Sequence, residues 1–309
     1  MNEDPSESFI IQTLLSARPV LGTVPLVDAG EDDACILPGG LAITSDALVD
    51  GVHFDHRWSA ADIGWRVVAV NASDIGAMGG RPTWMTLALA LPRPLDRGWV
   101  VAFSAGLHEA LRCFRVSLVG GDTLRSNQGV VASVTMGGIA PRPARRSDAQ
   151  DGDDLWVTGR PGQAAVGFFH GPNAALLRPR PPVEFGAALA DNSLVHGMMD
   201  ISDGIAVDLG RLCRASALGA VVWPESLPEL QGLPAGEDPL PLQTSFGDDY
   251  ELLFTAAPAH AGDIRALAAG WGTSVTRIGA MGGQGSPTLH GRQWPLSTFS
   301  HFAGPAVPC

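Results

Sequence analysis

Hydrophobic and polar positions in the first half of the chain follow two different periods, one typical of helices and one typical of strands. Apolar residues recur at helical spacing in three segments, 6–16, 61–78 and 98–114. Apolar runs typical of strands occupy 41–45, 84–91, 115–119 and 130–138. We expect the first of these strands to end at Asp46 and the third to run into a turn at Gly120–Thr123. The pattern predicts an α+β domain.

The second half repeats this alternation after a polar stretch at 141–153 that is rich in Arg and Pro. Strands are predicted at 155–158, 198–201, 220–223, 250–255 and 275–278. Helices are predicted at 163–169, 203–215 and 259–269, and a Pro-rich loop at 172–182. Because composition changes at the polar stretch, we expect one domain over 1–140 and a second α/β domain over 141–309.

Composition narrows the class of protein. Of the 309 residues, 45% are hydrophobic and 17% charged, which is typical of a folded chain. The net charge of -12 and the lack of a basic patch make nucleic acid an unexpected partner. No apolar run approaches the ~20 residues of a membrane span, and the acidic N-terminus is unlike a signal peptide. We therefore expect a cytoplasmic protein whose four cysteines, none at metal-ligand spacing, are reduced.

Aspartates recur in one setting, after a short apolar run and beside Gly, Ser or Thr. They are Asp33, Asp46, Asp74, Asp122, Asp200, Asp203 and Asp248. Carboxylates in such settings suit hard divalent cations such as Mg2+, which in turn hold phosphates. The chain contains no Lys, so Arg and bound metal must neutralise any phosphate. The combination predicts nucleotide-dependent phosphoryl chemistry.

Each motif taken alone has an ordinary structural explanation. Thr44-Ser45-Asp46 offers hydroxyls and a carboxylate to a metal, but equally fits a cap or turn. Gly120-Gly121-Asp122-Thr123 offers bare amides to a phosphate, yet such turns are common. In Asp200-Ile201-Ser202-Asp203-Gly204, strand alternation puts Asp200 and Ser202 on one face, and Ser202 or Asp203 is expected to cap the next helix. That helix N-terminus either holds a phosphate or is simply capped.

In order and spacing, the motifs together resemble the thiamine-monophosphate kinase family. The matching stretches are Asp32–Ala34, Thr44–Asp46 with His53-Phe54, Ala69–Gly79, Gly120–Thr123, Arg145–Ser147, Met199–Gly204 and Asp249–Phe254. Its superfamily includes aminoimidazole ribonucleotide synthetase and selenophosphate synthetase. The resemblance implies two α/β domains, each a mixed sheet packed with helices, and a homodimer formed through the N-terminal sheets. It further implies ATP-dependent phosphorylation of thiamine monophosphate to thiamine diphosphate with several Mg2+ ions.

The resemblance also implies roles for individual residues. The implied Mg2+ ligands are Asp33, Thr44, Ser45, Asp46, Asp74, Asp122, Asp200 and Asp203. The implied ATP contacts are Gly121, Asp122, Arg146 and Ser202. The implied contacts to thiamine phosphate are His53, Asp248 and Phe299. The N-terminal domain would bind ATP and Mg2+, and the C-terminal domain would complete the ATP and substrate sites.

Three residues depart from the family pattern. Glu31 stands where the family usually has Gly, and is expected to add a carboxylate near the metals. Phe246 also replaces a usual Gly, and Asp248 replaces a usual Glu, which shortens its reach by one methylene. Two other functions therefore stay open. One is a related ATP-dependent synthetase, and the other is a non-catalytic protein that binds a nucleotide or thiamine phosphate.

Overall fold

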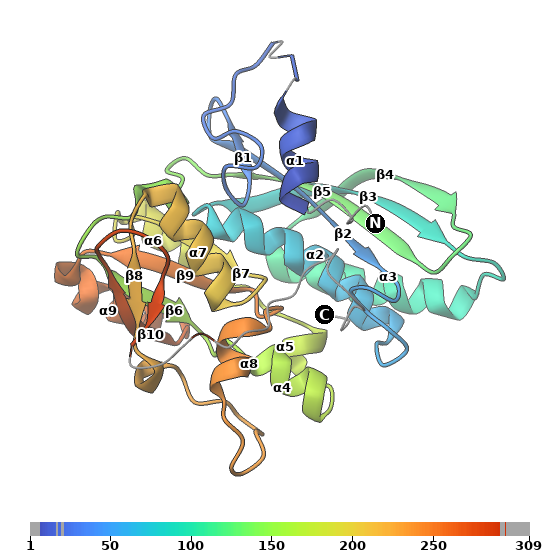
Figure 1. Ribbon diagram of the computed structural model, residues 1–309. Helices are drawn as coiled ribbons and strands as arrows, with labels where there is room; N and C mark the ends of the chain where they lie inside the picture. Colours follow the sequence, from blue (N-terminus) through green and yellow to red (C-terminus); the bar gives the residue numbers. More distant parts are fainter. Residues whose placement is uncertain (1–6, 17, 20–21, 291–293, 295–309) are drawn as a thin grey trace, which may run out of the picture.

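The computed structural model describes residues 7–16, 18–19, 22–290 and 294. Two mixed sheets, each packed with helices, lie on either side of the long helix α2 (Ala60–Ala77) (Figure 1). The first sheet belongs to the first half of the chain and the second sheet to the second half. No described helix has the length and apolar character needed to cross a membrane.

The first sheet has five strands in the order β1-β2-β5-β3-β4. The strands are β1 (Cys35–Leu37), β2 (Leu41–Val49), β3 (Arg81–Leu91), β4 (Ser117–Arg125) and β5 (Val131–Ile139). Strands β3 and β4 are parallel, and the other neighbours are antiparallel. The helices of this half are α1 (Glu7–Ser16), α2 and α3 (Arg97–Phe114). The predicted helices and strands of this half are all present, with shifted ends.

The second sheet has six strands in the order β11-β8-β10-β6-β9-β7. They are β6 (Asp154–Thr158), β7 (Met198–Ile201), β8 (Ala220–Val222), β9 (Glu251–Ala256), β10 (Val275–Met281) and β11 (Thr288–Leu289). The helices are α4 (Gln163–His170), α5 (Ala174–Leu177), α6 (Val183–Asp191), α7 (Ile205–Ser216), α8 (Leu240–Ser245) and α9 (Ala261–Trp271). Short 3-10 turns are η1 (Arg146–Asp148), η2 (Pro224–Ser226) and η3 (Pro258–His260). Helices α6 and α9 cover one face of the sheet, and α7 covers the other.

Helix α2 is buried along almost its whole length because both halves of the molecule pack on it. It begins at Ser59, whose hydroxyl accepts a hydrogen bond from the Asp62 backbone N–H. Helix α3 crosses it closely at Gly106, where an added Cβ would lie 1.8 Å from the carbonyl oxygen of Ala61. On the opposite side, a Cβ on Gly186 of α6 would lie 2.6 Å from the carbonyl oxygen of Gly76. Glycine at these crossings lets the backbones approach, so α2 is held by both halves.

Two predicted strand ends are wrong. Strand β2 continues past Asp46 to Val49, since pairing with β5 extends through that whole segment. The predicted turn at Gly120–Thr123 is instead part of β4, which pairs in parallel with β3. A Cβ on Gly121 would lie 1.9 Å from the carbonyl oxygen of Leu87, so glycine here permits close strand pairing.

Several short elements were not predicted. They are β1, β11, α5, α6 and α8, and α5 interrupts the loop expected at 172–182. Helix α6 follows directly on a run of prolines, which masked its short apolar stretch. The two-residue β11 pairs in parallel with β8, a contact from a distant part of the chain that no local pattern encodes.

Candidate active site

A cavity of about 350 Å³ lies where α2, β2 and the second half of the chain meet. Most predicted metal ligands line it, namely Asp33, Thr44, Ser45, Asp46, Asp74, Asp200 and Asp203. The predicted nucleotide contacts Arg146 and Ser202 also line it, as do the predicted substrate contacts His53 and Asp248. The structure thus brings together residues that are up to 215 positions apart (248 - 33) in the sequence.

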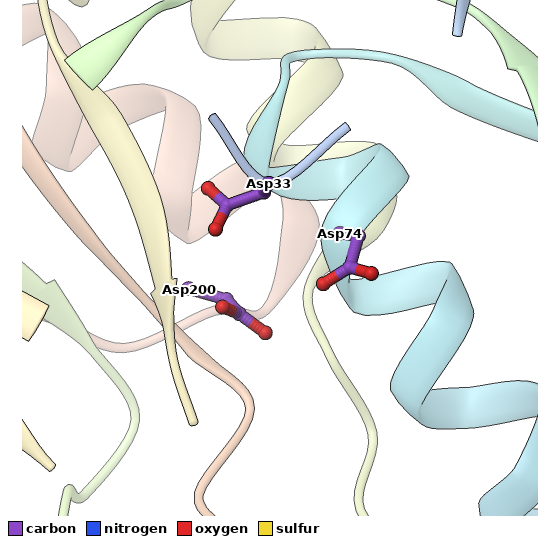
Figure 2. Close-up of side chains that lie close together, drawn as sticks. All are labelled: Asp33, Asp74 and Asp200. Atoms are coloured by element: carbon purple, nitrogen blue, oxygen red, sulfur yellow. The ribbon is translucent and has the colours of Figure 1, made fainter. Parts of the chain in front are cut away.

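Three carboxylates form the centre of this cavity. Ligand oxygens of Asp33, Asp74 and Asp200 all lie within 4.8 Å of one another. Figure 2 shows them converging from three places, the loop before β1, helix α2 and strand β7. Thr44 Oγ1 donates to Asp74 Oδ2 at 2.5 Å, and Ser73 Oγ donates to Asp200 Oδ2 at 2.6 Å. These hydroxyls hold two of the carboxylates in place.

The electrostatics of the cluster favour a cation. Burial raises the pKa of Asp74 well above its ordinary value, and the neighbouring Asp46, Asp200 and Asp33 raise it further. The pKa of Asp200 is raised in the same way, first by burial and then by Asp33. Among the described residues, Asp33 Oδ2 is buried without a hydrogen-bond partner. A set of hard oxygen donors with excess negative charge fits Mg2+.

Strand β2 and helix α2 meet along the cavity through hydrogen bonds. The Asp46 backbone N–H donates to Asn71 Oδ1 at 3.0 Å, and Asn71 Nδ2 donates to the Val67 carbonyl at 3.0 Å. Asn71 and Asp74 therefore both contact strand β2 from helix α2. Ser45 Oγ donates to the Val134 carbonyl of β5 at 2.8 Å and accepts from Thr135 Oγ1 at 3.5 Å.

Arg146 lies against two carboxylates at the start of the second half. Its guanidinium pairs with Asp33, and its Nε lies 3.3 Å from Asp32 Oδ1. Its backbone N–H donates to Asp32 Oδ2 at 2.9 Å. Burial and the adjacent Asp33 raise the pKa of Asp32 to about 7, although Arg146 opposes the shift. Asp32 lines the cavity but was not among the predicted site residues.

The loop between β7 and α7 is shaped by a residue that the sequence analysis did not single out. Asp208 Oδ2 accepts hydrogen bonds from the backbone N–H groups of Ser202 and Asp203, at 3.1 and 2.9 Å. The expectation that Ser202 or Asp203 caps α7 is wrong, because Gly204 is the N-cap residue and the helix has no side-chain cap. Asp208, in its first turn, instead bonds back to the loop.

Arg211 adds a second guanidinium to the cavity. Its Nη1 donates to Asp208 Oδ1 at 2.8 Å, and its Nη2 lies 2.5 Å from Asp203 Oδ2. It lies on α7, one turn beyond Asp208. An Arg–Asp pair at this spacing is common on helix surfaces, so no local pattern indicates that this one faces the cavity.

The predicted substrate residues lie at another side of the cavity. His53 Nδ1 accepts a hydrogen bond from the Val49 backbone N–H at 3.1 Å, so its neutral ring carries a proton on Nε2. Asp248 is buried and pairs with the guanidinium of Arg66, a residue of α2 that was not predicted. Tyr250 donates from its hydroxyl to Asp248 Oδ1 at 3.1 Å.

Some predicted residues lie elsewhere. Gly121 and Asp122 are exposed on the edge strand β4, with β3 and β5 between them and β2, and neither lines the cavity. Phe299 lies outside the described residues.

Two of the three departures from the family pattern, Glu31 and Phe246, lie outside the cavity. The expected carboxylate at Glu31 is exposed, accepts from the Asp28 backbone N–H at 2.9 Å, and does not line the cavity. Phe246 packs against Phe168 and Phe169, with ring centroids 5.1 and 5.4 Å apart, and does not line it either.

Comparison with known proteins places this geometry in a family. Residues 30–140 match the N-terminal domain of AIR synthase related proteins, and residues 150–292 match the C-terminal domain. The thiamine-monophosphate kinase of Salmonella typhimurium is 35% identical, over 82% of this chain and 84% of its own. The thiamine-monophosphate kinase of Escherichia coli K12 is 36% identical over the same shares.

Solved structures agree with the sequence comparison. The thiamine-monophosphate kinase from Stenotrophomonas maltophilia K279a superposes with a TM-score of 0.77 at 35% identity, over 88% of this chain and 92% of that one. AaThiL complexed with AMPPCP and TMP superposes with a TM-score of 0.81 at 25% identity, over 96% and 97% of the two chains. The chain belongs to the thiamine-monophosphate kinase family of AIR synthase related proteins.

Proposed function

We propose that this protein transfers the γ-phosphoryl group of ATP onto thiamine monophosphate, giving thiamine diphosphate and ADP. One observation carries the proposal, the convergence of the Asp33, Asp74 and Asp200 carboxylates in a cavity that also holds two guanidinium groups. The names of the relatives support it, as does the AaThiL complex, since AMPPCP is an ATP analogue.

The residues that would hold Mg2+ are the three converging aspartates, joined by Asp46, Asp203, Thr44 and Ser45 along the same cavity. Bound Mg2+ would neutralise phosphate charge and hold the reacting groups in line. The buried Asp33 oxygen that lacks a partner among the described residues supports this assignment. So does the set of raised carboxylate pKa values, because an added positive charge relieves the mutual repulsion.

The chain's own residues bind and orient the two substrates. Arg146 and Arg211 are the guanidinium groups that line the cavity, and we assign them to the phosphates of ATP, with Ser202 beside them. The protonated Nε2 of His53 is a donor for a phosphate oxygen of the acceptor. Asp248, which belongs to the second half, would contact the part of the acceptor other than its phosphate. The nucleophile is already an anionic phosphate oxygen, so positioning takes the place of a general base.

The roles of Gly121 and Asp122 depend on a second copy of the chain. We propose a homodimer that covers the first sheet, since edge strand β4 is exposed throughout and carries Leu118, Val119 and Leu124 at 43%, 61% and 47% exposure. A partner on this surface would enclose Gly121 and Asp122 and give them a phosphate or metal to contact. We also propose that the first domain ends at residue 140.

The test is an ADP-release assay with ATP, Mg2+ and thiamine monophosphate, with the product identified by its mass. Formation of thiamine diphosphate in step with ADP supports the proposal. ADP release with a different acceptor, but not with thiamine monophosphate, would favour a related synthetase. Tight binding of both ligands without any ADP release would favour a binding protein.

A further inference from the structure

Arg66 is a deeply buried charged side chain near the cavity, with only 1% of it exposed. Its guanidinium pairs with Asp248 and donates from Nη1 to the Leu176 carbonyl at 2.8 Å. The same group lies over the rings of Trp58 and Tyr250, 4.9 and 5.3 Å from their centroids. These two ring contacts and two polar contacts restrict the orientation of the guanidinium.

Asp248 uses only one of its oxygens in this arrangement. Oδ1 is bound by Arg66 and by the Tyr250 hydroxyl, which lies 3.1 Å away. Within the described part of the chain, Oδ2 is buried and has no hydrogen-bond partner. Asp248 is one of the residues that line the cavity. A buried carboxylate oxygen without a donor is costly, which points to a donor supplied by a ligand.

The backbone around Asp248 is strained in a way that fits a functional role. Asp248 and Tyr250 have φ angles of 63° and 52°, in the left-handed region that residues other than glycine rarely adopt. Their backbone N–H groups donate to the carbonyls of Ser202 and Ile201, each at 2.9 Å. The segment is therefore tied to the loop that follows β7, and Arg66 ties its side chain to α2.

We propose that Arg66 is a positioning residue for the acceptor. It holds Asp248 so that Oδ2 accepts a hydrogen bond from an N–H group of the acceptor's heterocycle. Its guanidinium gives the buried Asp248 carboxylate a paired cation in a cavity lined by other carboxylates. The position of Oδ2 depends on the lengths of both side chains, because the long side chain of Arg66 meets the short side chain of Asp248. This inference rests on the proposed function, because it names the residue that orients the acceptor of that reaction.

The experiment compares the wild type with R66K, D248E and the R66K/D248E double variant in steady-state assays with ATP and thiamine monophosphate. Each single variant is expected to raise KM for thiamine monophosphate about tenfold, with KM for ATP changed less than about twofold. The double variant is expected to recover most of that loss, because the longer carboxylate meets the shorter ammonium. A purely structural salt bridge would not separate the two KM values.

Two further variants keep the test decisive. R81K alters an arginine that also joins the two halves, through Glu184 at 3.0 Å and Asp191 at 2.9 Å, and should leave both KM values unchanged. Y250F removes one bond to Asp248 with little change in shape, and should raise KM for thiamine monophosphate about threefold even if R66K does not fold.

The outcomes separate the two proposals. If the wild type does not phosphorylate thiamine monophosphate, both the proposed function and this inference fail. If the wild type is active but R66K and Y250F leave KM for thiamine monophosphate unchanged, or shift both KM values equally, only the inference is overturned. Failure of the double variant to recover beyond the single variants also overturns it.

Discussion

The hydroxyl of Thr44 donates a hydrogen bond of 2.5 Å to Oδ2 of Asp74, joining strand β2 to helix α2 within the cavity. The bond satisfies one oxygen of a buried carboxylate whose neighbours are themselves acidic. An amide at this position can still accept the bond from Thr44, but it no longer repels the neighbouring carboxylates. Shape and charge at Asp74 can therefore be separated by experiment.

The Asp74→Asn variant is expected to lose activity and gain stability. Loss of the carboxylate should lower kcat/KM by about two orders of magnitude or more, since metal positioning supplies several kcal/mol of transition-state stabilisation. In EDTA its Tm should exceed that of the wild type by about 2 °C or more, because repulsion with Asp46 and Asp200 is reduced. Calorimetry with and without Mg2+ checks this. The exposed Asp263→Asn is the control, and a lower Tm in EDTA for Asp74→Asn would contradict the argument.

Arg211→Gln should weaken binding of ATP. Without Lys in the chain, a guanidinium that lines the cavity is one of few charges available to phosphate, so KM for ATP should rise about tenfold. Arg211→Lys keeps the charge, and its KM for ATP should lie between that of the wild type and that of Arg211→Gln. The matched control is Arg214→Gln, an exposed position on the same helix. Equal KM values for the Arg211→Gln and Arg214→Gln proteins would argue against a phosphate role.

Glu251 predicts a pH dependence of stability. Burial raises its pKa to about 7 in the folded chain, against about 4.3 when unfolded, although the Thr158 hydroxyl opposes the shift. The folded state thus binds the proton more tightly, and the free energy of unfolding must fall as pH rises from about 4 to about 7. In Glu251→Gln, this fall of the unfolding free energy with rising pH should be absent. Urea unfolding at several pH values checks it, with the exposed Glu229→Gln as control. Parallel profiles for wild type and Glu251→Gln would refute the assignment.

Phe246→Ala should affect stability and not substrate binding. Its ring packs against Phe168 and Phe169 and lies outside the cavity lining. Loss of these contacts from a partly buried site should cost about 1–3 kcal/mol. Chemical denaturation measures the loss, and Val101→Ala, at a side chain with 70% exposure, is the control. A marked rise in KM for thiamine monophosphate would place Phe246 in the substrate site instead.

The sequence predicted the elements that carry their own periodicity. Helix α2 and strand β7 were predicted nearly to the residue, and the aspartates at their polar positions do converge. These signals are local, since Asp74 is unusual in an apolar helix and Asp200 stands at the end of a short apolar strand. The resemblance to the family rested in addition on the order and spacing of the motifs along the chain.

The missed residues depend on contacts between distant segments. Arg66 appeared as one charge on an apolar helix, and only the fold brings Asp248, 182 positions away, against it. Asp208 and Arg211 have the spacing of an ordinary surface pair, yet they bind the loop beside the cavity. Gly120–Thr123 has the composition of a turn, and only pairing with β3 makes it a strand. Local pattern cannot encode such partners.

Helix α2 carries residues that serve both ends of the cavity. Arg66 and Asp74 lie eight residues apart, about 12 Å along a rigid helix axis. Arg66 pairs with Asp248, and Ser73, the neighbour of Asp74, donates a hydrogen bond to Asp200. Both of these aspartates belong to the second half, where the Asp248 backbone N–H donates to the Ser202 carbonyl. A movement of the second half away from α2 would therefore open both ends of the cavity in a single event. Under the proposed function, such a movement would open the nucleotide and acceptor sites together.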